Sequence, residues 1–371
     1  MARRIFLYIG LPKTGTTFIQ TTMWHNRAAL RRQGLLYPGR SRFDHFHASQ
    51  ELRTKPEVTR GRLPVWQSLA AAAANFDGDV LITHEFFSMF KPAQIRRCLA
   101  SLPPAEIHVV VTVRSYVLQW PAVWQEGLKM FVDQSFDTFM ADALENRLQG
   151  AWGWRSQNIP QVLHKWSAEI PADRIHVITV PPPGSPRNLL WDRWTETTGI
   201  DDTRLERDVA FANSSLGAPQ AALLHALKPR LSEELLDGAT RHRWVRQYFG
   251  HEVLVPQQGP RFGTRPDVTA ELVRRSRAAA RTIRREGYDV VGDLGDLRYQ
   301  PPDPEVPPPY PDDVTTEQML EVALDAIEQM IRDHRAATLE RDALRAKLSR
   351  RTPSRASLSR SLSPRRRNVD D

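Results

Sequence analysis

Four short apolar runs recur in the first half of the chain, each followed by glycine, proline or polar residues. They are residues 4–9, 79–83, 107–113 and 174–180. Runs of this length that are apolar throughout are typical of strands buried on both faces of a sheet. We therefore predict four buried strands, the last of them stopped by three consecutive prolines at 181–183.

Longer segments with apolar residues at three- and four-residue spacing separate these runs and predict helices. In the first half they are residues 16–32, 92–102, 118–131, 136–148 and 159–170. Strands that alternate with helices indicate a parallel sheet covered on both faces, so we expect an α/β fold, a three-layer sandwich. After Asn188 the pattern is mostly helical, with predicted helices at residues 220–227, 233–248 and 268–285.

The composition changes near Tyr299 and divides the chain into four parts. We predict a globular domain over residues 1–299 and a stiff, proline-rich linker over 300–314. Residues 315–348 follow as a helix that docks or self-associates, because Leu320, Leu324, Ile327 and Ile331 form one apolar stripe. Residues 349–371 are rich in Ser and Arg, and we expect them to be disordered.

The net charge of +8 is unevenly spread over the 371 residues. Seven Arg and two Asp give residues 349–371 a charge of +5, so all the others together carry only +3. The net positive charge therefore comes largely from residues 349–371. We expect no nucleic-acid partner for the folded part. A modestly positive cleft would still suit an anionic ligand.

The sequence also bears on disulfides, membrane segments and the location of the protein in the cell. Cys98 is the single cysteine, which excludes an internal disulfide framework and a cysteine-based zinc site. No apolar run approaches the length of a membrane helix. The apolar run at residues 5–9 is too short for a signal peptide, so we predict a cytoplasmic protein.

The first predicted strand runs into the loop Gly10-Leu11-Pro12-Lys13-Thr14-Gly15-Thr16-Thr17. Glycines let a backbone wrap an anion, and the amides at the start of the next helix point toward it. In a Walker A loop, G-x-x-x-x-G-K-[ST], the lysine would stand where this chain has Thr16. Here the lysine is Lys13, inside the loop, so it meets a different part of a phosphate chain.

This strand, loop and helix resemble the 5′-phosphosulfate-binding loop of sulfotransferases that use 3′-phosphoadenosine 5′-phosphosulfate (PAPS). The resemblance implies that Lys13 stabilises charge on the leaving phosphate, that Thr16 and Thr17 bind the 5′-phosphate, and that Phe18 stacks on adenine. The implied contacts of the loop with PAPS come from Pro12, Lys13, Thr14, Gly15, Thr16, Thr17 and Phe18.

A second anion site is predicted where the third strand ends in Arg114 and Ser115. Ligands of parallel α/β sheets bind at the carboxyl ends of the strands, and an arginine fork suits a phosphate. The family has an arginine here that binds the 3′-phosphate, with a helix serine eight residues later. This chain has Ala122 at that position, so Ser115 or another segment would have to supply the missing contact.

The segment from Arg114 to Lys129 also resembles a group of bacterial sulfotransferase-family proteins, alanine included. The overall similarity extends over about residues 5–297. Trp120, Trp124 and Lys129 fall near one face of the predicted helix, and we expect the two tryptophans to lie in the core.

The second strand ends in His84 and Glu85, which offer two candidates for the general base. A histidine titrates near neutrality, whereas a glutamate needs its pKa raised by burial. The family uses a histidine or a glutamate in this role, so the choice stays open. Alternatively, neither residue is the base: His84 orients the loop and Glu85 caps a helix. His45 and His47 are further candidates, as pocket residues or as part of a surface loop; we expect no metal.

The predicted function is transfer of a sulfuryl group from PAPS to a hydroxyl or amine of a carbohydrate, lipid or small-molecule acceptor. Two alternatives remain: a P-loop nucleotide kinase or NTPase, and a non-catalytic nucleotide-binding protein of the same fold. Against the kinase, Thr16 replaces the Walker lysine and His84-Glu85 replaces a plain metal-binding aspartate. No residue pattern names the acceptor.

Overall fold

The computed structural model describes residues 1–54, 64–207, 215–301 and 306–351. Within them, six parallel strands form one sheet in the order β2-β3-β1-β4-β5-β6. The strands are β1 Arg4–Tyr8, β2 Leu35–Leu36, β3 Asp79–Thr83, β4 Glu106–Val113, β5 Ile175–Thr179 and β6 Asp289–Val291. All four predicted strands are confirmed, and the two short edge strands β2 and β6 are additional.

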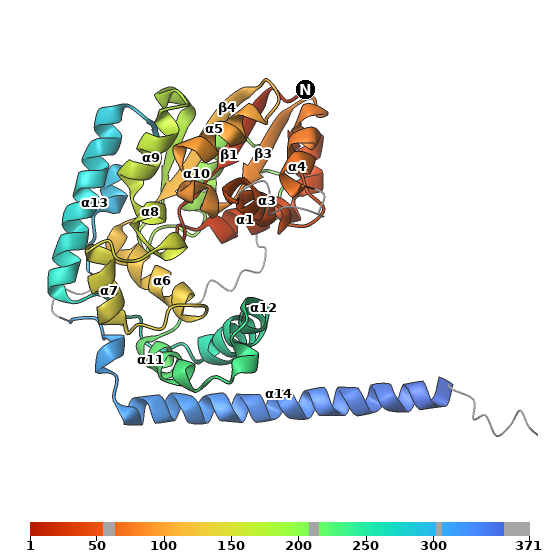
Figure 1. The fold of residues 1–371 in the computed structure, drawn as a ribbon, viewed down its shortest axis with the longest axis vertical. Helices are drawn as coiled ribbons and strands as arrows, with labels where there is room; N and C mark the ends of the chain where they lie inside the picture. The colour runs from red at the N-terminus through yellow and green to blue at the C-terminus, as the bar shows by residue number, and fades with distance from the viewer. Residues whose placement is uncertain (55–63, 208–214, 302–305, 352–371) are drawn as a thin grey trace, which may run out of the picture.

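Side chains alternate along each strand between two apolar cores, one on each face of the sheet. Ile5 and Leu7 of β1 point into the larger core, and Phe6 and Tyr8 point into the smaller one. Helices that contribute to the larger core include α4 Val65–Ala74, α5 Pro92–Ala100, α6 Tyr116–Leu128, α9 Ile159–Ser167 and α13 Pro266–Glu286. Helices α1 Thr16–His25, α2 Arg27–Arg32 and α10 Leu189–Thr198 cover the other face, which confirms the three-layer α/β fold (Figure 1).

Two predictions for the first quarter of the chain, one of a helix and one of a loop, are wrong. Residues 16–32 form two helices, because Asn26 interrupts them and its side-chain amide donates hydrogen bonds to Thr22 O and Glu206 O. The segment treated as a loop around His45 is helix α3, Asp44–Arg53. Its polar residues hide the helical period from the sequence pattern.

Three other predicted helices differ from the observed ones mainly at their ends. Helix α7 is Phe136–Leu144, α11 is Ala218–Leu227 and α14 is Thr316–Arg351. The predicted helix at 233–248 is instead the short α12, Gly238–Thr240, followed by a π-helix, η7, Arg241–Leu254. Short helices α8, Trp154–Gln157, and η2, Glu85–Met89, complete the surroundings of the sheet edge.

Helix α14 lies below α11 and η7 and extends beyond the rest of the described chain (Figure 1). Val322 and Ala326 are buried against these neighbours, whereas Leu320, Leu324 and Ile331 on the opposite side stay exposed. The described part of the proline-rich segment is held against the domain. Pro309 O accepts a hydrogen bond from Gly263 N, and both carboxylate oxygens of Asp312 accept amides at the start of α7.

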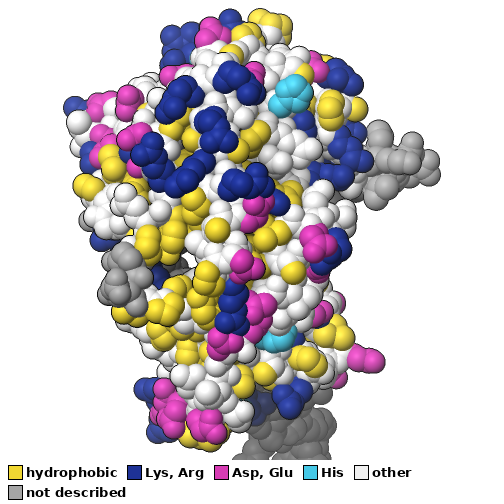
Figure 2. Space-filling model, turned by 90° about the vertical axis from the view of Figure 1, so that its left-hand side faces the viewer, with side chains coloured by type: hydrophobic (Ala, Val, Ile, Leu, Met, Phe, Trp, Pro, Cys, Tyr) yellow, Lys and Arg dark blue, Asp and Glu magenta, His cyan; other side chains and the backbone are white. Residues whose placement is uncertain are grey.

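Helix α13 covers one side of the molecule with a row of basic residues. Its exposed arginines are Arg274, Arg277, Arg281, Arg284 and Arg285. Figure 2 shows Lys and Arg side chains gathered on this face. No helix among the described residues is both long and apolar enough to cross a membrane.

Candidate functional site

The glycine-rich loop between β1 and α1 has a backbone that depends on its glycines. Gly10 and Gly15 have φ values of 51° and 87°, a region that glycine enters without steric cost. A Cβ atom on Gly10 would lie 2.4 Å from Thr16 Cγ2, and one on Gly15 would lie 2.6 Å from Leu190 Cδ2. The loop therefore keeps its shape only with glycine at both positions.

Lys13 has a positive φ of 68°, which is uncommon for a residue with a side chain. Its ammonium lies 3.3 Å from Glu126 Oε2 on α6, and Arg246 of η7 donates to the other oxygen at 2.6 Å. Burial alone would raise the pKa of Glu126, but Lys13 and Arg246 lower it well below its ordinary value. Glu126 is therefore ionised and fixes the loop lysine in place.

The other side chains of the loop divide into structural and accessible groups. The buried Thr14 hydroxyl donates to Leu11 O at 2.6 Å and contacts Thr112 Oγ1 at 2.6 Å, so only its backbone remains for a ligand. Thr16 packs its methyl near Gly10, and Thr17 is exposed. The ring of Phe18 meets Trp191 edge-on at 6.3 Å, and its stacking on adenine stays a prediction.

Arg114 leaves the carboxyl end of β4, the strand that pairs with β1, and reaches toward the loop. Its Nη1 atom lies 3.5 Å from Lys13 O. Burial, with a smaller effect of Arg261, lowers the pKa of Arg114 to about 10. Neither arginine forms an ion pair with a carboxylate in the part of the chain that the structure describes. The two form a basic site beside the glycine loop, and Arg261 is a member that the sequence did not reveal.

Ser115 and Ala122 are the two uncharged residues that the sequence analysis considered for this second basic site. The Ser115 hydroxyl is fully buried and has no hydrogen-bond partner among the described residues. A buried hydroxyl without a partner is costly, and a ligand that accepts its hydrogen bond would remove the cost. Ala122 is partly exposed on α6. Ser115 and Arg261 are therefore the polar groups near Arg114 that could contact a ligand.

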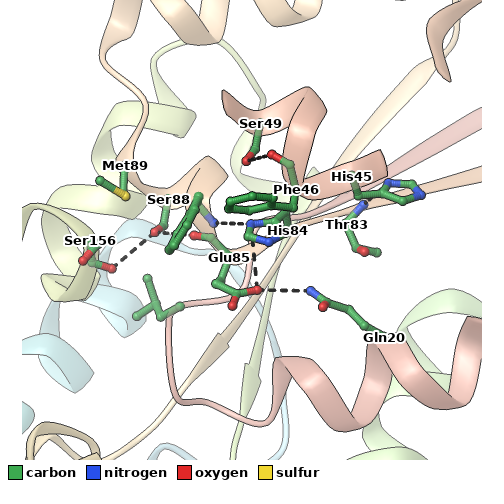
Figure 3. Close-up of polar contacts among 12 residues, drawn as sticks. Gln20, His45, Phe46, Ser49, Thr83, His84, Glu85, Ser88, Met89 and Ser156 are labelled. Carbon is green, nitrogen blue, oxygen red and sulfur yellow. Dashed lines mark hydrogen bonds and ion pairs between the residues drawn. The ribbon is translucent and has the colours of Figure 1, made fainter. Parts of the chain in front are cut away.

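His84 and Glu85 lie at the end of β3, next to the glycine loop, as Figure 3 shows. His84 Nδ1 accepts the amide of Phe86 at 3.1 Å and so caps the short helix η2. Burial lowers the pKa of His84, which favours the neutral ring. Because Nδ1 accepts the Phe86 amide, the neutral ring carries its proton on Nε2 and has no free lone pair. Glu85 Oε2 accepts from Gln20 Nε2 at 3.2 Å and lies 4.0 Å from His84 Nδ1.

The two histidines near residue 46 have different environments. His45 is buried: its Nδ1 accepts the amide of Thr83 at 3.3 Å and its Nε2 donates to Pro38 O at 2.8 Å. It is a structural part of the β3 end, not a pocket residue. His47 is exposed. Among the described residues, no group of three or more His, Cys, Asp or Glu is placed to hold a metal.

The structure brings most of the sequence-predicted residues to one edge of the sheet. Lys13, His84 and Arg114 follow β1, β3 and β4, which are neighbours in the sheet. Trp120 and Trp124 are fully buried, as predicted. Sequence reasoning missed Glu126, Arg246 and Arg261. Of these, only Glu126 had a signal in the sequence, because it lies within the Arg114–Lys129 segment that carries the resemblance.

Comparison with known proteins gives matches among solved structures alone. No protein-family model and no curated protein sequence matches the chain. A sulfotransferase from Alicyclobacillus acidocaldarius is 13% identical and has a TM-score of 0.35, over 57% of this chain and 88% of that one. The sulfotransferase domain from the curacin biosynthetic pathway is 9% identical with a TM-score of 0.33, over 74% and 97%. At such low values these likenesses carry no conclusion about activity.

Proposed function

We propose that this protein transfers a sulfuryl group from PAPS to a hydroxyl or amine of a carbohydrate, lipid or small-molecule acceptor. One observation carries the proposal: the loop lysine, Lys13, lies against Arg114, an arginine with no carboxylate partner among the described residues. A donor with a phosphosulfate at one end and a separate 3′-phosphate at the other requires two such basic groups.

The residues at the sheet edge fit this donor. The loop amides and the amino end of α1 would hold the 5′-phosphosulfate, with Lys13 at the bridging oxygen. Arg114, Arg261 and the unpartnered Ser115 hydroxyl would hold the 3′-phosphate. Phe18, on the first turn of α1, would lie against the adenine.

Glu85 is the side chain that we assign as general base. PAPS supplies the sulfuryl group: the acceptor atom bonds to sulfur as the bond from sulfur to the 5′-phosphate oxygen breaks. The acceptor's proton passes to the Glu85 carboxylate. His84 is a positioning residue, because its Nδ1 lone pair is used by the Phe86 amide. Glu126 is a weaker candidate, because Lys13 and Arg246 hold it in its ionised form.

Thermal stabilisation by nucleotides tests the proposal. PAPS and adenosine 3′,5′-bisphosphate should each raise Tm by several degrees, and adenosine 5′-monophosphate by much less, because it lacks the 3′-phosphate. Arg114→Gln should reduce the response to the bisphosphate more than the response to the monophosphate. A response to ATP with magnesium alone would favour the P-loop kinase or NTPase instead.

A further inference from the structure

A further group of polar side chains, of which Lys129 and Arg246 are basic, lies near Glu126 between α6 and η7. Lys129 follows α6 and is only 3% exposed, and its ammonium has no hydrogen bond or ion pair among the described residues. His251 of η7 has a buried Nε2 atom that also lacks a partner. A buried polar atom without a partner, such as His251 Nε2, is costly, and a buried ammonium such as that of Lys129 needs negative charge nearby.

The charges at this place do not balance. Arg246 and Lys13 bind opposite oxygens of Glu126, so this carboxylate already serves two cations. Lys129 is left as the third. Burial, helped by Lys13 and Arg246 and opposed by Glu126, lowers the pKa of Lys129 to about 8. An anion at this position would supply the charge that Glu126 alone cannot.

The π-helix η7 holds the group in place. Arg241 donates to Met130 O at 2.8 Å, and Lys228 donates to the same carbonyl at 3.3 Å, so both tie the carboxyl end of α6 to the helices that follow. Gly250 packs next to the Lys129 stem, since a Cβ atom there would lie in ordinary contact with Lys129 Cδ, at 3.5 Å. Distortions of helices toward π geometry occur frequently at functional sites.

We propose that Lys129, Arg246 and His251 bind an anionic group of the acceptor, so that the acceptor is an acidic molecule bearing a carboxylate, phosphate or sulfate ester. This inference rests on the proposed sulfuryl transfer. The donor's two anionic ends are accounted for by the loop and by Arg114 with Arg261. Arg246 binds the oxygen of Glu126 opposite to the one that Lys13 binds, and its group is the basic site that remains for the acceptor.

Two measurements on the full chain test the inference, the first without any ligand. Lys129→Met keeps most of the side-chain volume and removes the unpaired charge, so Tm should rise by a few degrees. The matched control Lys347→Met, exposed on α14, should leave Tm unchanged. A fall in the Tm of Lys129→Met would show that Lys129 supports the fold, and would overturn the inference.

The second measurement uses inorganic phosphate as the probe, on protein saturated with adenosine 3′,5′-bisphosphate at constant ionic strength. Phosphate should raise Tm further, and Lys129→Met and Arg246→Gln should each weaken its apparent affinity at least tenfold. Arg243→Gln, at an exposed position of η7, is the control and should respond as the wild type does.

The outcomes separate this inference from the proposed function. No stabilisation by the bisphosphate itself would count against the proposed function. Stabilisation by the bisphosphate without any further effect of phosphate, or with an equal effect in all variants, would overturn the acceptor site alone. Displacement of phosphate by the bisphosphate would assign the group to the donor and would also overturn it.

Discussion

At the scale of single residues, Lys13 combines a left-handed backbone with an ion pair to a carboxylate on another element. Any replacement with a side chain meets the same backbone cost, so a methionine there changes mainly the charge. Lys13→Met should lower kcat by about 100-fold or more, because the leaving phosphate loses its cation. Transfer assays measure this, with circular dichroism to verify the fold. Unchanged turnover would remove Lys13 from the chemistry.

The two neighbouring candidates for the base should respond differently to substitution. Glu85→Gln removes the proton acceptor and should lower kcat by about 100-fold or more. His84→Asn keeps a side-chain oxygen that can accept the Phe86 amide and should retain most of the activity. Steady-state rates of the two variants decide between them. An inactive His84→Asn beside an active Glu85→Gln would reverse the assignment.

His45 should make stability depend on pH. Burial lowers the pKa of His45 to about 4, whereas in the unfolded chain it is near the ordinary 6.5. Between these values the unfolded chain binds the proton and the folded chain does not. His45 thus contributes stability fully above about pH 6.5 and loses it as the pH falls toward 4. The loss is roughly 3 kcal/mol.

Urea unfolding at pH 7 and pH 4.5 measures this dependence. His45→Gln can still accept the Thr83 amide and donate to Pro38 O, but it does not titrate. Its free energy of unfolding should therefore fall less between the two pH values than that of the wild type. An equal fall in both proteins would contradict the role given to His45.

At the scale of elements, the first amides of helix α7 are bound by Asp312, which lies far along the chain. Asp312 accepts from Phe136 N at 3.1 Å and from Asp137 N at 2.8 Å. Asp312→Ala should lower the free energy of unfolding by about 1 kcal/mol, the usual effect of losing a helix cap. Asp325→Ala, at an exposed position of α14, should have no measurable effect in the same denaturation experiment.

At the scale of the whole molecule, α14 has two apolar faces, and the described residues cover only one of them. On the covered face, Val322 and Ala326 are buried. On the other face, Leu324 and Ile331 are 53% and 64% exposed. The predicted self-association through this helix uses the second face. Ile331→Glu should then lower the mass per particle, whereas Ala336→Glu should not. Light scattering measures the mass, and a monomeric wild type would remove the pairing.

The sequence by itself determined the four buried strands, the phosphate-type loop and the lysine inside it. These features are local: a buried strand shows as an apolar run, and a loop with positive φ values shows as glycine at Gly10 and Gly15. The edge strands β2 and β6 have two and three residues, which is too short for any periodicity to show. Helix α3 was missed because most of its residues are polar.

Only the tertiary structure decided the partners of the charged residues. Lys13 and Glu126 are 113 positions apart, and Arg246 comes from a third segment. A lysine or arginine has the same letter whether it is solvated, paired or buried, so the sequence could place Lys129 on the helix face of Trp120 and Trp124 but could not give its neighbours. The same holds for His84, whose role as a cap depends on where the Phe86 amide points. Burial and pairing arise only when distant segments pack together.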